Sequence, residues 1–283
     1  MERFSKQYIK NTGVLLLNIR PSLVDRDTLV IDLNSPVRSL GTTVYGGGLG
    51  YIGSVIFKRV DKCFSNPSPQ AYAGEIARSL GRESSAVFLT ASDVSQYIYS
   101  EAEDSGVSVE GIATIGLTHP ACIGGEPESR AIGTINIFIL TSEGLSDIGL
   151  ADLLRTVSEA KAGYLSILGL SCRGLPAVGT VSDATLVASP GGSTDYAGLG
   201  TLVGQLASRV LRNIFRSHMS SRGLDDYMRY MGYEDRDNIH PRHALLKRLE
   251  LLVEEIMGID IIPWLDRGAA KEILRIIWRI SHG

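Results

Sequence analysis

The chain has 283 residues, of which 44% are hydrophobic and 21% charged, the balance of a globular protein that can bury a sizeable core. Its net charge of -3 leaves no basic footprint for nucleic acid or an anionic membrane, so we exclude nucleic-acid binding. No run approaches the roughly 20 apolar residues that span a bilayer, and three widely spaced cysteines favour a reducing, cytoplasmic location.

Four apolar runs in the first 60 residues predict β-strands, at residues 13–19, 28–33, 39–45 and 51–57. The last two runs are separated by a glycine-rich segment that contains Gly46, Gly47 and Gly48. Consecutive glycines indicate close backbone approach or positive φ, as around a bound substrate, but a glycine-rich hairpin is equally compatible. Their spacing does not match the loops that bind nucleotide phosphates.

Helical and strand patterns alternate in the next 60 residues. We expect a helix at 70–80, a strand at 85–90, a helix at 94–104 and a strand at 107–117. Asp93 precedes the second helix, where capping is the commoner role and acid–base chemistry the alternative. His119 follows the last strand in a loop; it is a candidate general base, although a single histidine is more often incidental.

Polar side chains interrupt two further strands. The run at 131–140 is apolar enough to be buried on both faces, yet it contains Asn136. A buried amide needs partners, so Asn136 either braces a loop or holds a substrate carbonyl. Thr180, Ser182 and Asp183 directly precede the next apolar run, where loops carry chemistry on a rigid scaffold.

A long helix between these strands carries a lysine on its apolar face. At 100° per residue, seven apolar side chains share that face. They are Leu150, Leu153, Leu154, Val157, Tyr164, Leu165 and Leu168. Lys161 lies among them and must either find a partner or a polar cavity, or extend its ammonium to solvent along the edge of the core. Glu159 projects from the opposite face, where a solvated carboxylate is expected.

The last part of the chain is helical. A helix is predicted at 198–217, and residues 222–283 contain no strand-like run. We therefore expect an α+β fold, with a mixed, largely antiparallel sheet covered by helices and a helical C-terminal extension. The predicted domains are 1–218 and 219–283.

Seven short motifs together resemble the adenosylcobinamide amidohydrolase family of cobamide salvage, in the family's order and over roughly residues 10–215. They are residues 46–48 (GGG), 89–93 (LTASD), 114–118 (TIGLT), 133–137 (GTINI), 159–162 (EAKA), 179–183 (GTVSD) and 196–198 (YAG). The relatives usually have threonine at Ser158, glycine and threonine at Val181 and Ser182, and asparagine at His119. A histidine that the relatives lack is not the family's obligatory base.

The resemblance implies hydrolysis of the amide that joins the corrin propionate to 1-amino-2-propanol, with release of adenosylcobyric acid. The corrinoid is then a small-molecule substrate rather than a cofactor. We assign no residues to a metal site and leave a metal requirement open, and a homo-oligomer is one option.

Amide hydrolysis needs an attacking oxygen, donors for the oxyanion and a proton for the leaving amine. On this reading Lys161 supplies the proton or stabilises the oxyanion, Thr180 or Ser182 is the nucleophile, and Glu159, Asp93 or Asp183 activates water. The candidate substrate-binding residues are Gly46, Gly47, Gly48, Thr134, Asn136 and His119.

Two other functions remain open. The first is a self-processing amidase, because a threonine at a new N-terminus is a competent nucleophile. Glycine precedes threonine at Gly41–Thr42, Gly133–Thr134, Gly179–Thr180 and Gly200–Thr201. The second is a corrinoid-binding protein without catalysis, in which the same polar residues hydrogen-bond the ring.

Overall fold

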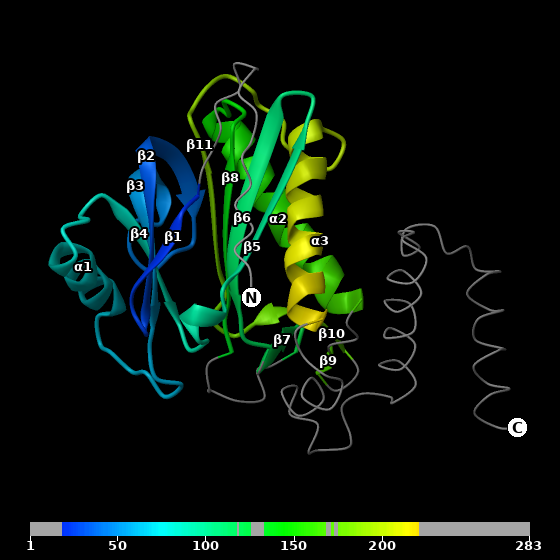
Figure 1. The fold of residues 1–283 in the computed structure, drawn as a ribbon. Helices are drawn as coiled ribbons and strands as arrows, with labels where there is room; N and C mark the ends of the chain where they lie inside the picture. Colours follow the sequence, from blue (N-terminus) through cyan, green and yellow to red (C-terminus); the bar gives the residue numbers. More distant parts are fainter. Residues whose placement is uncertain (1–18, 118, 126–132, 168–170, 173–174, 221–283) are drawn as a thin grey trace, which may run out of the picture.

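The computed structural model describes residues 19–117, 119–125, 133–167, 171–172 and 175–220 (Figure 1). The helices of the described residues are α1 (Pro69–Ser79), the 3-10 helix η1 (Val94–Gln96), α2 (Asp147–Ile167) and α3 (Leu202–Ser220). The strands are β1 (Pro21–Asp25), β2 (Thr28–Gly41), β3 (Gly48–Arg59), β4 (Ser85–Thr90), β5 (Ile98–Asp104), β6 (Val107–Ile115), β7 (Pro120–Cys122), β8 (Ile135–Thr141), β9 (Ser171–Cys172), β10 (Leu175–Thr180) and β11 (Ala184–Ser189).

The main sheet has eight strands in the order β4-β3-β2-β11-β8-β6-β5, with β1 paired to β2. The pairs β3–β4 and β8–β11 are parallel, and the other pairs of this sheet are antiparallel. A second sheet contains β7, β10 and β9. The predicted α+β fold with a mixed, largely antiparallel sheet is therefore confirmed.

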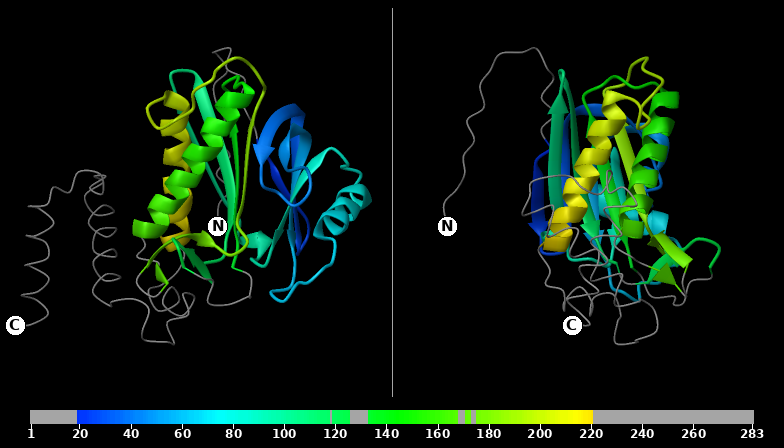
Figure 2. Two further views of the ribbon diagram at one scale, coloured as in Figure 1. Left: turned by 180° about the vertical axis from the view of Figure 1, so that it is seen from behind. Right: turned by 90° about the vertical axis from the view of Figure 1, so that its right-hand side faces the viewer.

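Helices α2 and α3 cover one face of the main sheet, while α1 lies at the β4 end (Figure 2). The predicted apolar face of α2 is buried at Leu150, Leu153, Val157 and Leu165, each fully enclosed. These side chains pack with alternate residues of β6 and β8 and with α3. The long α2 helix is thus held along its length, which fixes the positions of its few polar side chains.

The other face of the sheet packs against itself. Phe57 of β3 stacks on Phe88 of β4, with ring centroids 4.5 Å apart, and both rings share one buried cluster with Phe138 of β8. Because β4 and β8 are far apart in the strand order, this shared cluster requires the sheet to curl. The ends of β4 and β8 are consequently brought near each other.

The helix predicted at 94–104 is wrong. The structure has the short helix η1 followed by β5, which forms an antiparallel hairpin with β6. The hairpin turns at Ser105 and Gly106, which have φ of 49° and 81°. Positive φ at two successive turn residues matches the twist of the flanking strands, so a tight turn overrides a weak helical pattern.

The first strands also differ from the sequence prediction. The runs at 28–33 and 39–45 form one strand, β2, whose pairing with β3 shifts register between Asp32 and Val37. Pro36 lies inside that irregularity, where a missing N–H does not break a regular ladder. Strand β1 was not predicted at all.

The strand predicted at 13–19 and the helices predicted at 222–283 lie outside the described residues, apart from Ile19. Helix α3 continues past the predicted domain boundary at 218 to Ser220, and the two domains stay a prediction. In the part of the chain that the structure describes, no helix is long and apolar enough to cross a membrane. Cys122 is disulfide-bonded and Cys63 is free, a bond that the cysteine spacing did not predict.

We expect Phe88→Ala to lower the free energy of unfolding by about 3–5 kcal/mol, because it leaves a cavity in the cluster that β3, β4 and β8 share, which the surrounding side chains fill only in part. Urea unfolding followed by circular dichroism measures this change. Leu49→Ala is the control, since Leu49 is 46% exposed, and it should change stability by less than about 0.5 kcal/mol. Equal losses in the two variants would contradict the shared core.

Candidate active site

Lys161 of α2 and Asp183 of the turn before β11 form a largely buried ion pair. Lys161 Nζ donates to Asp183 Oδ2 at 2.7 Å, and the two side chains are only 13% and 11% exposed. The lysine therefore does not extend to solvent, which was the alternative that the sequence left open. The ammonium group thus connects the C-terminal half of α2 to the turn between β10 and β11.

Asp183 collects hydrogen bonds from three segments of the chain. Besides Lys161, the amides of Thr180 and Ile135 donate to it at 2.9 and 2.8 Å, and so does Thr180 Oγ1. A Cβ atom on Gly179 would lie 2.5 Å from Asp183 Oδ2 and 3.2 Å from Lys161 Nζ. A larger residue at position 179 would push the ends of the Asp183 and Lys161 side chains aside, so glycine there favours the ion pair as it stands.

A second set of hydroxyl groups lies next to this carboxylate. Ser182 Oγ donates to the carbonyl of Gly133 at 3.0 Å and lies 2.8 Å from Thr134 Oγ1. Ser182 is exposed, whereas Thr134 is 1% exposed. Because Ile135 binds Asp183, the hydroxyl pair and the ion pair meet at the start of β8.

Asn136 points away from Lys161. Its neighbours Ile135 and Ile137 face α2, so Asn136 faces the opposite side of β8, with Phe138 two residues on. Its Nδ2 donates to the carbonyl of Leu89 at 3.0 Å, and its side chain is fully buried. The amide nitrogen thus braces strand β4, rather than a loop, against β8, and contact of Asn136 with a substrate stays a prediction.

His119 lies beside the site, directly before the first residue of β7. Its neighbour Pro120 pairs with Thr180, and its φ of 63° is unusual for a residue with a side chain. Within the part of the chain that the structure describes, its buried Nδ1 has no hydrogen-bond partner. Burial, with a smaller contribution from the positive charge of Lys62, lowers the pKa of the imidazole. The neutral form is therefore favoured, which fits a substrate contact better than a proton store.

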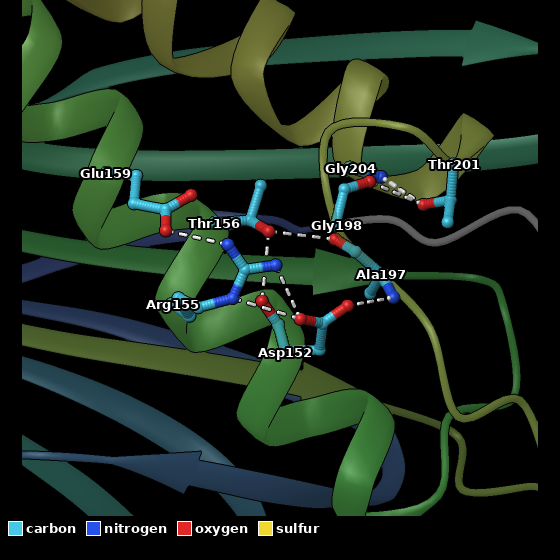
Figure 3. A network of polar contacts seen from close by, with 8 residues as sticks. All are labelled: Asp152, Arg155, Thr156, Glu159, Ala197, Gly198, Thr201 and Gly204. Atoms are coloured by element: carbon cyan, nitrogen blue, oxygen red, sulfur yellow. Dashed lines mark hydrogen bonds and ion pairs between the residues drawn. The ribbon is translucent and has the colours of Figure 1, made fainter.

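Glu159 belongs to a different polar network (Figure 3). It accepts from Arg155 Nη1 at 2.6 Å, and Arg155 also donates to Asp152 at 2.7 Å. The other oxygen of Asp152 accepts from the Ala197 amide at 2.8 Å. A Cβ on Gly198 would lie 3.0 Å from Arg155 Nη2. This network, which the sequence analysis missed except for Glu159, joins α2 to the 196–198 motif.

Asp93 acts as a cap. It accepts from the amide and the hydroxyl of Ser95 at 3.0 and 2.7 Å, and these bonds hold the pKa of its carboxyl below the usual range. In the described residues no hydrogen bond or ion pair joins it to Asp183. The capping role is thus the one that the geometry supports, and a role in activating water stays a prediction.

The three glycines at 46–48 have backbone reasons to be glycine. Gly46 and Gly48 have φ of 66° and 76°, and a Cβ on Gly46 would lie 2.2 Å from the carbonyl oxygen of Ser85. A Cβ on Gly47 would lie 2.4 Å from the carbonyl oxygen of Thr43. Close backbone packing at Gly46 and Gly47 and positive φ at Gly46 and Gly48 account for these residues in the connection between the antiparallel strands β2 and β3, and substrate binding by them stays a prediction.

No group of three or more His, Cys, Asp or Glu side chains that could hold a metal occurs in the described ranges. The polar atoms gathered around Asp183 are an ammonium, amides and hydroxyls, which donate protons. This composition favours hydrogen-bond chemistry over metal ligation at this point.

Fold and site together define an α+β protein in which a buried ammonium and several hydroxyl groups meet at strand ends. These groups can transfer protons and stabilise an oxyanion. The family model described as adenosylcobinamide amidohydrolase matches residues 16–221. The chain belongs to the adenosylcobinamide amidohydrolase family, whose members are hydrolases of amide bonds.

Two curated relatives carry the same description. The adenosylcobinamide amidohydrolase of Halobacterium salinarum is 36% identical over 120 residues, which cover 39% of this chain and 49% of that protein. The one from Methanosarcina mazei is 27% identical over 194 residues, 64% of this chain and 90% of that protein. The first alignment thus spans about half the length of the relative.

Among solved structures, a Burkholderia sp. beta-aminopeptidase is similar over 70% of this chain and 78% of that chain, with 11% identity and a TM-score of 0.39.

We expect Glu159→Gln to leave turnover of adenosylcobinamide within about threefold of wild type, because Glu159 is half-exposed and bonds Arg155 rather than the Lys161–Asp183 pair. Arg155→Ala should instead lower the melting temperature, since it removes the ion pairs to Asp152 and Glu159. Thermal unfolding and steady-state kinetics measure these effects. A loss of more than about a hundredfold in kcat for Glu159→Gln would contradict this expectation and show that Glu159 takes part in the reaction.

Proposed function

We propose that this chain hydrolyses adenosylcobinamide at the amide between the corrin propionate and 1-amino-2-propanol, and releases adenosylcobyric acid for cobamide salvage. The observation that carries the proposal is the family match over residues 16–221. The Lys161–Asp183 pair supports it, because amide hydrolysis needs a positive group near the developing oxyanion.

Lys161 is assigned to stabilise that oxyanion and to protonate the leaving amine. An ammonium group has three N–H donors, and Asp183 accepts one of them. Among the described residues Asp183 is the one acceptor of Lys161 Nζ, and the remaining donors are assigned to a substrate carbonyl oxygen and then to the departing nitrogen. The low exposure of the pair excludes bulk water, which strengthens each of these electrostatic contacts.

Asp183 is assigned to position Lys161 rather than to activate water. Both of its oxygens already accept hydrogen bonds, from Lys161, Thr180 and Ile135. Thr180 is 6% exposed and donates its hydroxyl proton to Asp183, so its hydroxyl also serves to orient the carboxylate. His119, on the neighbouring β7 edge, is assigned to contact the corrinoid in its neutral form.

A corrinoid-binding protein without catalysis is the second reading, and product analysis separates it from the hydrolase. The purified full-length chain is incubated with adenosylcobinamide, and the products are identified by mass. We expect adenosylcobyric acid and 1-amino-2-propanol in equal amounts. Tight binding of the corrinoid with no product would establish the binding protein instead.

We expect Lys161→Met to lower kcat by about 100-fold to 1000-fold with a smaller change in KM, because Lys161 acts mainly on the oxyanion. The matched control is Lys58→Met, since Lys58 of β3 lies outside the site and donates to Thr28 of β2. It should leave kcat within about threefold of wild type. A kcat near wild type in a folded Lys161→Met variant would remove Lys161 from the mechanism.

A further inference from the structure

The hydroxyl of Ser182 bridges the two residues of the Gly133–Thr134 peptide bond. Its oxygen donates to the Gly133 carbonyl at 3.0 Å and lies 2.8 Å from Thr134 Oγ1. A hydroxyl has one proton, which Ser182 uses on the carbonyl, so Thr134 donates its own proton to Ser182. The hydroxyl of Thr134 is thereby connected through Ser182 to the carbonyl oxygen of the residue before it.

This peptide bond is held firmly on its C-terminal side. Thr134 and Gly116 exchange two backbone hydrogen bonds of 3.0 and 2.9 Å, and the next amide, that of Ile135, binds Asp183 at 2.8 Å. Thr134 is 1% exposed. An external protease cannot reach a bond that is this deeply buried. The hydroxyl of Thr134 itself, however, is connected through Ser182 to the carbonyl of the bond.

In the described residues, the hydroxyl groups of the other three glycine–threonine pairs bond elsewhere. The hydroxyl of Thr42 accepts from the Thr185 amide, that of Thr180 donates to Asp183, and that of Thr201 donates to the Gly198 carbonyl. In the described residues, a third group connects the threonine hydroxyl to the preceding glycine carbonyl at Gly133–Thr134 alone.

We propose that the chain cleaves its own Gly133–Thr134 bond. Thr134 Oγ1 attacks the carbonyl carbon of Gly133, and its proton leaves through Ser182. The C–N bond then breaks, the nitrogen of Thr134 takes up a proton, and an ester joins Gly133 to Thr134 Oγ1. One water molecule hydrolyses the ester, which gives a carboxylate on Gly133 and restores the hydroxyl of Thr134.

Cleavage would create the attacking group for the proposed amide hydrolysis, and this part of the inference rests on that proposed function. The new α-amine of Thr134 can take the proton of the adjacent hydroxyl, since α-amines have a pKa of about 7.7–8.0. The Lys161 ammonium is connected to the same strand start through Asp183 and Ile135. The two fragments stay together because β8 pairs with β6 and β11 pairs with β2, so each pair joins one fragment to the other.

Intact mass and N-terminal sequencing of the purified full-length chain test the proposal. We expect two fragments, residues 1–133 and 134–283, the second with threonine at its N-terminus, in place of one chain of 30.5 kDa. Thr134→Ala should stay uncut and inactive, and Thr134→Ser should cut. Ser182→Ala should slow cutting by at least about tenfold. The control, Thr201→Ala, should cut as wild type does. Circular dichroism shows that each variant is folded.

The outcomes separate the two proposals. An uncut chain that releases adenosylcobyric acid would overturn self-cleavage and leave the proposed function standing. A chain cut at Thr134 that binds adenosylcobinamide without releasing product would uphold self-cleavage and overturn the proposed function. Cutting in a folded Thr134→Ala variant would overturn self-cleavage by this threonine.

Discussion

The ion pair between Lys161 and Asp183 is the constraint on which the site depends. Removing an ammonium and a carboxylate from water costs several kcal/mol for each group. The attraction between the two charges offsets this cost only if their geometry is good and their remaining hydrogen-bonding capacity is used. The structure meets this condition through donors from Thr180 and Ile135 and through the space left by Gly179. The pair therefore joins α2, β8 and the β10–β11 turn at one point.

The parallel pairing of β8 and β11 explains why these residues meet. Asn136 pairs with Ala184, so the residues just before each strand, including Thr134 and Ser182, lie side by side. Parallel neighbours start at the same edge of a sheet, and two motifs separated by about 40 residues in sequence then form one site. The curl of the sheet adds β4 through the bond between Asn136 and Leu89. The site is thus built on rigid elements, as positioning of reacting groups requires.

Sequence patterns could predict the fold class and the unusual place of Lys161, because strand alternation and helical periodicity are local properties. They could not predict the partner of Lys161, since Asp183 lies 22 residues away and is brought near by tertiary packing. The segment of β5 was predicted as a helix, although β6 was predicted as a strand, because the turn between them needs positive φ at Ser105, which composition does not reveal. The side chain of Asn136 lies on the face of β8 opposite to α2. Which residues of a strand point to which face cannot be read from a run that is apolar on both faces.

The central claim is that Lys161 and Asp183 act as one unit in catalysis. A double-mutant cycle on kcat, with Lys161→Met, Asp183→Asn and the combined variant, tests it most directly. The account predicts that the combined variant loses about as much kcat as Lys161→Met alone, because Asp183 acts through the lysine that it positions. Losses that multiply across the two substitutions would show independent roles and contradict the account.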